Sequence, residues 1–351
     1  MNRQPRSLSI LGRLTLLLLL AVPLLVMPPV AALSAVPLSN QMPAPEPGQA
    51  LAPAGTGCWS LAANYPETAW GVATTAHDGS LYSFGGSNGA ILSNAYRYDP
   101  ALDAWSAIAP LPTPRSAATA TSDGTYIYIL GGSDTITGTT TLYRYDPIAN
   151  NYITLAEAPQ AVFAHAAALL NGNLYRIAGN VAGASNTVDV YTIGANTWAS
   201  GPAYPLSVIY PRAVAWNGYI YTLGGREGAL GTAKTYRFDG STWDDAGMAD
   251  LPAGAGRWAA GVSFLSGQLI VAGGETPGAA VSTALAWNPT SDSWSSLPNM
   301  LQLQAWMDGA TLGSTFYTVA GFGENNLNLV QRYMAACHAY LPVVFRNPVQ
   351  P

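Results

Sequence analysis

Two kinds of side chain that could hold a ligand recur at fixed places in this sequence of 351 residues. Each place is measured from a pair of small residues, usually Gly-Gly, that ends an apolar segment. Charged side chains follow the pair at Asp134, Arg226, Glu227, Glu275 and Glu324. Aromatic side chains stand fifteen residues before it at Trp70, Phe163 and Trp258, with Trp306 one residue out of step, and arginines stand nearby at Arg115 and Arg257. Rings that stack on a sugar face, beside carboxylates that bond its hydroxyls, predict noncovalent ligand binding.

The sequence has none of the usual catalytic or metal-binding motifs. Its three histidines, His77, His165 and His338, share no spacing that would hold a metal ion. It contains no Ser-His-Asp arrangement, no phosphate-cradling loop and no calcium loop. We therefore predict no metal and no cofactor. Carboxylates could still act as acid and base on a sugar, but their separation depends on the fold.

The candidate residues lie at fixed distances from a sequence motif that occurs six times. Its clearest copy reads YIYILGG at 126–132 and YRYDP at 143–147, which predicts two antiparallel strands. The first residue of the small pair is Gly85, Gly131, Ala178, Gly224, Gly273 and Ala320 in turn, so the steps are 46, 47, 46, 49 and 47 residues. A period this long and regular predicts stacked units that cannot bury their faces alone.

Each unit contains four expected strands. One strand opens with an aromatic residue 26 residues before the small pair at Trp59, Trp105, Tyr152, Trp198 and Trp294, and 30 residues before it at Trp243. Asp-Gly and Asn-Gly pairs at 78–79, 123–124, 171–172 and 217–218 predict the hairpin turns between the next two strands. The strand that ends at the small pair is apolar on both faces, as a sheet packed between two other sheets requires.

These features resemble kelch repeats, in which a di-glycine follows an apolar strand and a Trp follows a Tyr-Asp pair by a fixed spacing, as Trp105 follows Tyr98. The resemblance covers about 58–340. It implies an all-β fold, a six-bladed β-propeller of four-stranded antiparallel blades around a central channel. The departures are Ala-Gly at 178–179 and 320–321, Tyr152 in place of Trp, and the short spacing from Phe238 to Trp243.

The antiparallel order gathers the candidates on one face of the disc, called the rim face below. The starts of the innermost strands, the ends of their neighbours and the loops after the small pair all lie on that face. One interpretation is an acidic rim around an aromatic mouth that binds a ligand. In the other, the rings pack between blades and the acids are only solvated. Kelch domains often carry an arginine where Arg115 and Arg257 stand, but Arg212 is out of register, so a basic ring for an acidic peptide is largely missing.

The ring must close or leave open sheet edges. The strand at Trp59 would complete the sixth blade, and this turn brings together the two cysteines, Cys58 and Cys337. We predict a Cys58–Cys337 disulfide in an oxidising compartment, with two unpaired cysteines as the alternative. A competing closure uses Tyr340 and leaves Trp59 as a surplus edge strand. The copper site of galactose-oxidase-like kelch enzymes needs a modified cysteine, so with both cysteines at the closure it is rejected.

Four segments are expected along the chain. Residues 1–32 have the layout of a signal peptide, with an uncleaved membrane anchor as the alternative. A Pro/Ala-rich linker at 33–57 precedes the propeller at 58–340, and the tail at 341–351 is either an edge strand or a surface-sorting signal. We expect a secreted or cell-surface protein without a membrane span once the signal is removed.

Charge and composition limit the classes of molecule that the protein is expected to bind. Without the three arginines of the signal peptide, 11 basic residues face 19 acidic ones, which argues against nucleic acid. We expect a monomeric binding module for a glycan or protein ligand at the rim face rather than an enzyme. The alternative is a carbohydrate-active enzyme, by analogy with secreted six-bladed kelch sialate mutarotases, in which Arg115, Arg257, Glu227 and Glu275 would be the candidates.

Overall fold

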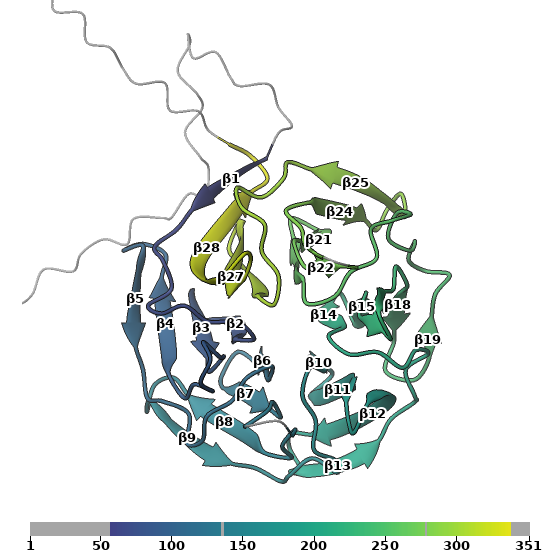
Figure 1. The fold of residues 1–351 in the computed structure, drawn as a ribbon. Helices are drawn as coiled ribbons and strands as arrows, with labels where there is room; N and C mark the ends of the chain where they lie inside the picture. Colours follow the sequence, from purple (N-terminus) through teal and green to yellow (C-terminus); the bar gives the residue numbers. More distant parts are fainter. Residues whose placement is uncertain (1–56, 135–136, 278, 338–351) are drawn as a thin grey trace, which may run out of the picture. The chain divides into compact units, whose positions relative to one another are not determined.

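The computed structural model describes residues 57–134, 137–277 and 279–337, which all belong to one compact unit. They form six four-stranded antiparallel sheets around a central channel (Figure 1), which confirms the predicted all-β, six-bladed propeller. These ranges include no helix long and apolar enough to cross a membrane. The expected signal peptide 1–32, the linker 33–57 apart from its last residue, His338, Tyr340 and the tail 341–351 lie outside the described residues.

Each blade is built outward from the strand that lines the channel. Blades 1 to 3 consist of β2 (Ala73–His77), β3 (Ser80–Phe84), β4 (Ala95–Asp99) and β5 (Ala104–Ala107); β6 (Thr119–Ser122), β7 (Ile127–Leu130), β8 (Leu142–Asp146) and β9 (Asn151–Thr154); and β10 (Ala166–Leu170), β11 (Asn173–Asn180), β12 (Ala184–Thr192) and β13 (Thr197–Ser200). Blades 4 to 6 consist of β14 (Arg212–Trp216), β15 (Tyr219–Leu223), β18 (Thr235–Phe238) and β19 (Trp243–Asp244); β20 (Gly261–Leu265), β21 (Gln268–Ala272), β24 (Ala284–Asn288) and β25 (Ser293–Leu297); and β26 (Asp308–Leu312), β27 (Thr315–Phe322), β28 (Asn326–Met334) and β1 (Cys58–Leu61). Two short hairpins follow the di-glycines of blades 4 and 5: β16 (Arg226–Glu227) with β17 (Leu230–Gly231), and β22 (Glu275–Thr276) with β23 (Ala279–Ala280).

The burial of a strand follows its place in the blade. The second strands are buried on both faces, as β3 and β7 show at every residue. The outermost strands β5, β9 and β13 bury only one aromatic residue in part. That ring packs on a tyrosine of the third strand, with centroid distances of 5.1, 4.9 and 5.2 Å. The core therefore lies between adjacent blades, and the outer edge is held by ring-on-ring contacts.

The N-terminal strand closes the ring. β1 pairs with β28, with Trp59 opposite Tyr333, and the rings of these residues pack 5.3 Å apart. Cys58 and Cys337 form a disulfide with their Cα atoms 5.9 Å apart. The predicted closure at Trp59 and the predicted disulfide are both confirmed. The covalent link joins residues 279 positions apart in the sequence.

Six residues join the blades at the rim end of the channel in a closed circle of main-chain hydrogen bonds. These residues, called the mouth ring below, are Gly71, Ala117, Ala164, Tyr210, Ala259 and Trp306. Each N–H donates to the carbonyl of the member in the preceding blade, and Gly71 donates to Trp306, at 2.6 to 3.3 Å. All six have φ between 52° and 65°. Trp306 belongs to this ring, which explains why it stands one residue out of step with Trp70.

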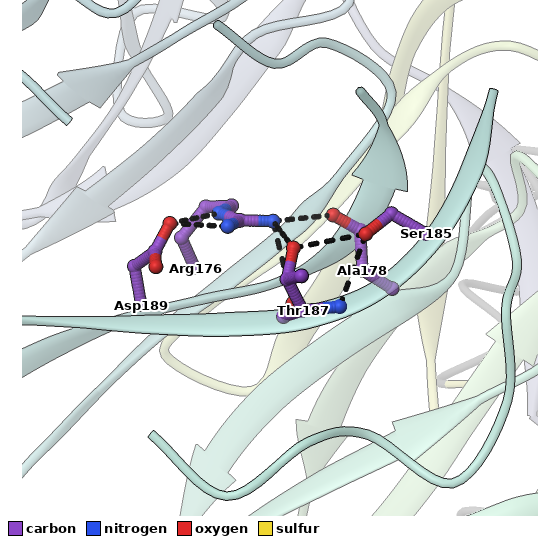
Figure 2. Close-up of polar contacts among 5 residues, drawn as sticks. All are labelled: Arg176, Ala178, Ser185, Thr187 and Asp189. Atoms are coloured by element: carbon purple, nitrogen blue, oxygen red, sulfur yellow. Dashed lines mark hydrogen bonds and ion pairs between the residues drawn. The ribbon is translucent and has the colours of Figure 1, made fainter. Parts of the chain in front are cut away.

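In blade 3 a fully buried arginine supports the end of the second strand. Arg176 Nη1 donates to the carbonyl oxygens of Ala178 at 3.0 Å and Thr187 at 3.3 Å. Its Nε and Nη2 donate to one carboxylate oxygen of Asp189, so the guanidinium lies between the carboxylate and the main chain (Figure 2). The charge is thus both paired and hydrogen-bonded, as burial requires.

Blades 5 and 6 bind the corresponding pair of carbonyls with a different residue. Arg257 Nη1 donates to Gly273 at 3.0 Å and to its neighbour across the sheet, Thr283, at 3.1 Å. Gln304 donates in the same way to Ala320 and Leu329. Both donors come from the loop before the innermost strand, whereas Arg176 lies on the second strand. The carbonyl at the end of the second strand and its neighbour across the sheet therefore receive their side-chain hydrogen bonds from different sequence positions in different blades.

Candidate ligand-binding site on the rim face

A pocket of about 550 Å³ opens on the rim face, with walls from blades 5, 6 and 1. Its lining residues are Trp70, Glu275, Ala279, Ala280, Leu303, Trp306, Phe322, Gly323 and Glu324. Four of the predicted binding residues, Trp70, Glu275, Trp306 and Glu324, thus come together in one place. The other seven lie outside this pocket.

A main-chain bridge repeated in every blade explains how rings and acids meet. In all six blades the residue before the mouth-ring member pairs with the residue after the small pair, and in blade 6 this bridge joins Ala305, just before Trp306, to Phe322. In blade 5 this bridge joins Trp258 to Glu275, with N-to-O distances of 3.1 and 2.9 Å. Phe322 therefore holds the place in blade 6 that Glu275 holds in blade 5. The sequence prediction missed Phe322 because it sought only polar residues at this place.

Two indole rings form the aromatic part of the pocket. The Trp70 and Trp306 ring centroids are 5.7 Å apart, and their planes meet at 81°. Trp306 Nε1 donates to Glu275 Oε2 at 2.5 Å, which fixes both the ring and the carboxylate. Blade 5 thus orients a ring of blade 6, and the pocket depends on the contact between these blades.

Tyr210 contacts one of the pocket's two indole rings and was not predicted. Its ring packs on Trp306 with a centroid distance of 4.6 Å. Burial raises the pKa of Tyr210 to about 12, an effect that Arg226 and Arg212 partly oppose, so the hydroxyl stays neutral. Tyr210 and Trp306 occupy equivalent mouth-ring positions in blades 4 and 6. This shared period is the signal that could have identified Tyr210.

Five predicted residues lie elsewhere on the rim face. Arg226 lies over the Trp258 ring, 6.0 Å from its centroid, and Trp258 is buried. Phe163 is partly buried and packs against a cluster that contains Ala117 and Ala164. Glu227 is exposed in β16, and Asp134 is exposed after the di-glycine of blade 2. These residues form no common pocket with Trp70 and Trp306.

The two predicted arginines point into the protein. Arg115 and Arg257 are each 3% exposed. Arg115 donates to the Tyr143 hydroxyl at 3.4 Å. Arg257 binds main-chain carbonyls, and burial lowers its pKa to about 10, so it remains charged at neutral pH. Both arginines therefore bond within their own blades and are not available to a ligand in the rim-face pocket.

The central channel holds a second cavity, of about 500 Å³, lined by the innermost strands. Arg212 and Asp308 cross it from blades 4 and 6, with 3.5 Å between Nη1 and Oδ1. Two histidines line its wall, and each bonds to a hydroxyl of a neighbouring blade: His77 to Ser122 at 2.7 Å and His165 to Thr119 at 3.0 Å. Across residues 57–134, 137–277 and 279–337, no three His, Cys, Asp or Glu side chains gather as metal ligands.

Comparison with known proteins agrees with the repeat pattern. A family model described as the kelch motif matches residues 71–112, 114–158 and 259–301. These segments contain the small pairs of blades 1, 2 and 5, whereas the two Ala-Gly pairs and the short spacing from Phe238 to Trp243 fall outside them. Kelch-like protein 35 of Mus musculus is 27% identical over 188 residues, covering 52% of this chain and 32% of that protein. Kelch-like protein 15 of Danio rerio is 26% identical over 230 residues, covering 58% and 37%.

The chain spans about a third of the length of these curated relatives. Among solved structures, one titled "Structure of YjhT" superposes with a TM-score of 0.66 and 16% sequence identity, covering 78% of this chain and 96% of that one. At this identity the likeness concerns the fold alone. Motif, relatives and architecture agree: the chain carries kelch motifs in blades 1, 2 and 5, and its six repeats form a six-bladed β-propeller.

Proposed function

We propose that this propeller is a binding module that takes a protein ligand on its rim face. The observation that carries the proposal is the 550 Å³ pocket, whose walls combine two indoles, aliphatic side chains and two carboxylates. Apolar walls with a few polar groups are typical of binding sites, and buried aromatic anchors dominate many protein interfaces. Leu303 and Phe322 remain 38% and 39% exposed at the pocket, so a partner could cover them.

The kelch motifs and the Kelch-like relatives support the same class of function, because kelch propellers commonly act as interaction modules. The scaffold suits this role. Glu275 and Trp306 are held by a direct hydrogen bond, and a partner would meet a surface that is already ordered.

A glycan is the second candidate ligand, favoured by the two indole faces beside carboxylates. A glycan array probed with the purified protein tests it. For the enzymatic alternative, only Glu275 of its four candidate residues lines the pocket, while Arg115 and Arg257 are buried. Proton exchange spectroscopy on sialic acid anomers tests that alternative, and the geometry favours the binding module.

Selection from a random peptide library displayed on phage tests the proposed function. We expect peptides whose affinity falls at least tenfold in Phe322→Ala, because the variant removes an exposed aromatic contact of the pocket. Thr125→Ala is the matched control, since Thr125 is exposed in the turn before β7, at the opposite end of its blade. If no selected peptide distinguishes Phe322→Ala from wild type, the rim face is not the binding surface.

We also propose that the protein works outside the cytoplasm. The Cys58–Cys337 disulfide supports this location, because structural disulfides persist in oxidising compartments. N-terminal sequencing of the protein recovered from its source tests the expected cleavage after Ala32. A cytoplasmic protein that retains residues 1–32 would contradict the proposal.

A further inference from the structure

We propose that the rim-face pocket recognises an organic cation, the ammonium group of a lysine side chain on its protein ligand. This proposal rests on the proposed function, since it names the group that a ligand on the rim face inserts. Three properties of the pocket carry it: the placement of its rings, the sign of its charges and the lack of other polar side chains in its walls.

The rings offer faces suited to a cation. Trp70 and Trp306 stand nearly perpendicular, at 81°, so they form two walls of a corner. The negative face of an indole attracts an ammonium group, and tryptophan is the strongest of the aromatic side chains in this respect. Phe322 adds a third ring to the same lining. The Trp306 ring is fixed by its bond to Glu275 and by contact with Tyr210, so it is preorganised.

The charges of the pocket are negative. Glu275 and Glu324 line it, and none of its nine lining residues is basic. The two arginines that act on Tyr210 have other contacts: Arg226 lies over Trp258, and Arg212 pairs with Asp308 in the channel. Two carboxylates beside two indoles therefore favour a cation and disfavour an anion.

The remaining walls suit a lysine better than a sugar. No hydroxyl or amide side chain lines the pocket, and the Trp306 N–H already donates to Glu275. Sugar hydroxyls need donors as well as acceptors, whereas an ammonium group needs only acceptors and ring faces. Leu303, Ala279 and Ala280 provide aliphatic surface for the four-carbon stem of lysine. The pocket thus matches a cation on an apolar stem.

Titration of the full chain with two short peptides tests the proposal. One peptide contains a single lysine in an Ala/Gly sequence, and the other has norleucine, which keeps the stem and lacks the ammonium group. We expect the lysine peptide to bind about tenfold more tightly at low ionic strength, a preference that salt reduces. Equal affinity for the two peptides would overturn the proposal.

Variants locate the effect in the pocket. We expect Glu275→Gln and Glu324→Gln each to reduce the lysine preference about threefold, because each removes one negative charge. Trp306→Leu should reduce it about tenfold, with circular dichroism used to check folding. Glu227→Gln is the matched control, since it removes an exposed acid of the rim face outside the pocket. An equal loss in Glu227→Gln would show a general charge effect and overturn the proposal.

Three further results separate this proposal from the proposed function and from a different cationic ligand. If selected peptides bind the rim face but show no enrichment of lysine, the cation proposal is wrong and the binding function stands. If choline binds in the pocket and the lysine peptide does not, the ligand is a quaternary ammonium compound rather than a lysine side chain. If the lysine peptide binds in a Trp306-dependent way while library selection yields no longer peptide, the pocket is confirmed and the larger protein interface is not.

Discussion

At the scale of single residues, buried polar side chains in this protein serve the main chain. Arg176, Arg257 and Gln304 each bind the carbonyl at the small pair and its neighbour across the sheet. Arg176 differs from the other two because it also forms a buried ion pair with Asp189. An unpaired charge left in that place would be strongly destabilising.

Removing Arg176 should therefore cost more than removing the whole ion pair. We expect Arg176→Met to lower the free energy of unfolding by about 3 to 5 kcal/mol, since Asp189 then stays buried without a partner. The double variant Arg176→Met/Asp189→Leu should recover a large part of this loss. Urea denaturation of the three proteins measures the difference. Equal stability of the single and double variants would contradict this account.

His165 should make the protein sensitive to acid. Burial lowers its pKa to about 3, and the nearby Arg176 adds to the effect. Between pH 6.5 and 3 the unfolded chain then binds a proton that the folded chain does not, so the free energy of unfolding falls as the pH falls, by up to about 1.4 kcal/mol per pH unit.

The variant His165→Gln isolates this contribution from that of the carboxylates. We expect its unfolding free energy to depend less steeply on pH than that of the wild type between pH 6.5 and 3.5. Urea titrations at several pH values measure both slopes. Parallel slopes would show that His165 is protonated in the folded protein.

At the scale of elements, the junction between adjacent blades depends on the left-handed backbone of the mouth ring. A Cβ atom on Gly71 would lie 2.8 Å from Ser116 Oγ and 3.1 Å from Ala117 N, so the neighbouring blade leaves no room for it. Gly79 has a similar φ, +72° against +65°, but a Cβ atom there would have no neighbour within 4 Å. The two glycines thus share a left-handed φ and differ in crowding.

This pair separates backbone strain from contact between blades. Gly79→Ala should lower the free energy of unfolding by about 1 kcal/mol, the cost of the left-handed conformation. Gly71→Ala should cost about 1 to 3 kcal/mol more, because blade 2 must shift as well. Thermal denaturation measures both variants. Equal losses would mean that the junction adapts freely.

The repeat period made the elements predictable, whereas the pocket depended on contacts between repeats. The spacing from Gly85 to Ala320 indicated six blades because each blade needs the same strands and turns. Trp70, Glu275, Trp306 and Glu324, which the repeat spacing grouped together, line one pocket. Phe322 and Leu303 escaped prediction, since their role arises where blades 5, 6 and 1 meet. Arg257 was placed in the site because the sequence does not show that the carbonyls of Gly273 and Thr283 receive its hydrogen bonds.

At the scale of the whole propeller, stability depends on the closure of the ring. β1 completes the sixth blade, and the Cys58–Cys337 disulfide ties the two ends of the propeller together. The closed loop is long, so a chain-entropy estimate gives roughly 5 kcal/mol, and measured disulfides commonly contribute about 2 to 4 kcal/mol.

Opening this link should weaken the entire fold at once. We expect Cys58→Ala/Cys337→Ala to lower the free energy of unfolding by about 2 to 4 kcal/mol. Reduction of the wild type should reproduce this loss, and the same reductant should leave the double variant unchanged. Calorimetry under both conditions measures it. An unchanged melting temperature after complete reduction would show that β1 pairing alone closes the ring.

The circle of main-chain bonds at the mouth also has an electrostatic consequence. Each of its six N–H groups points the same way around the channel. Peptide dipoles that follow one another head to tail around a circle cancel along its axis, as they nearly do in a sheet. The backbone therefore contributes little fixed potential toward an approaching ion, so side chains alone set the polarity of this entrance. The same frame could attract anions after a few substitutions at Glu275 and Glu324, with no change to its architecture.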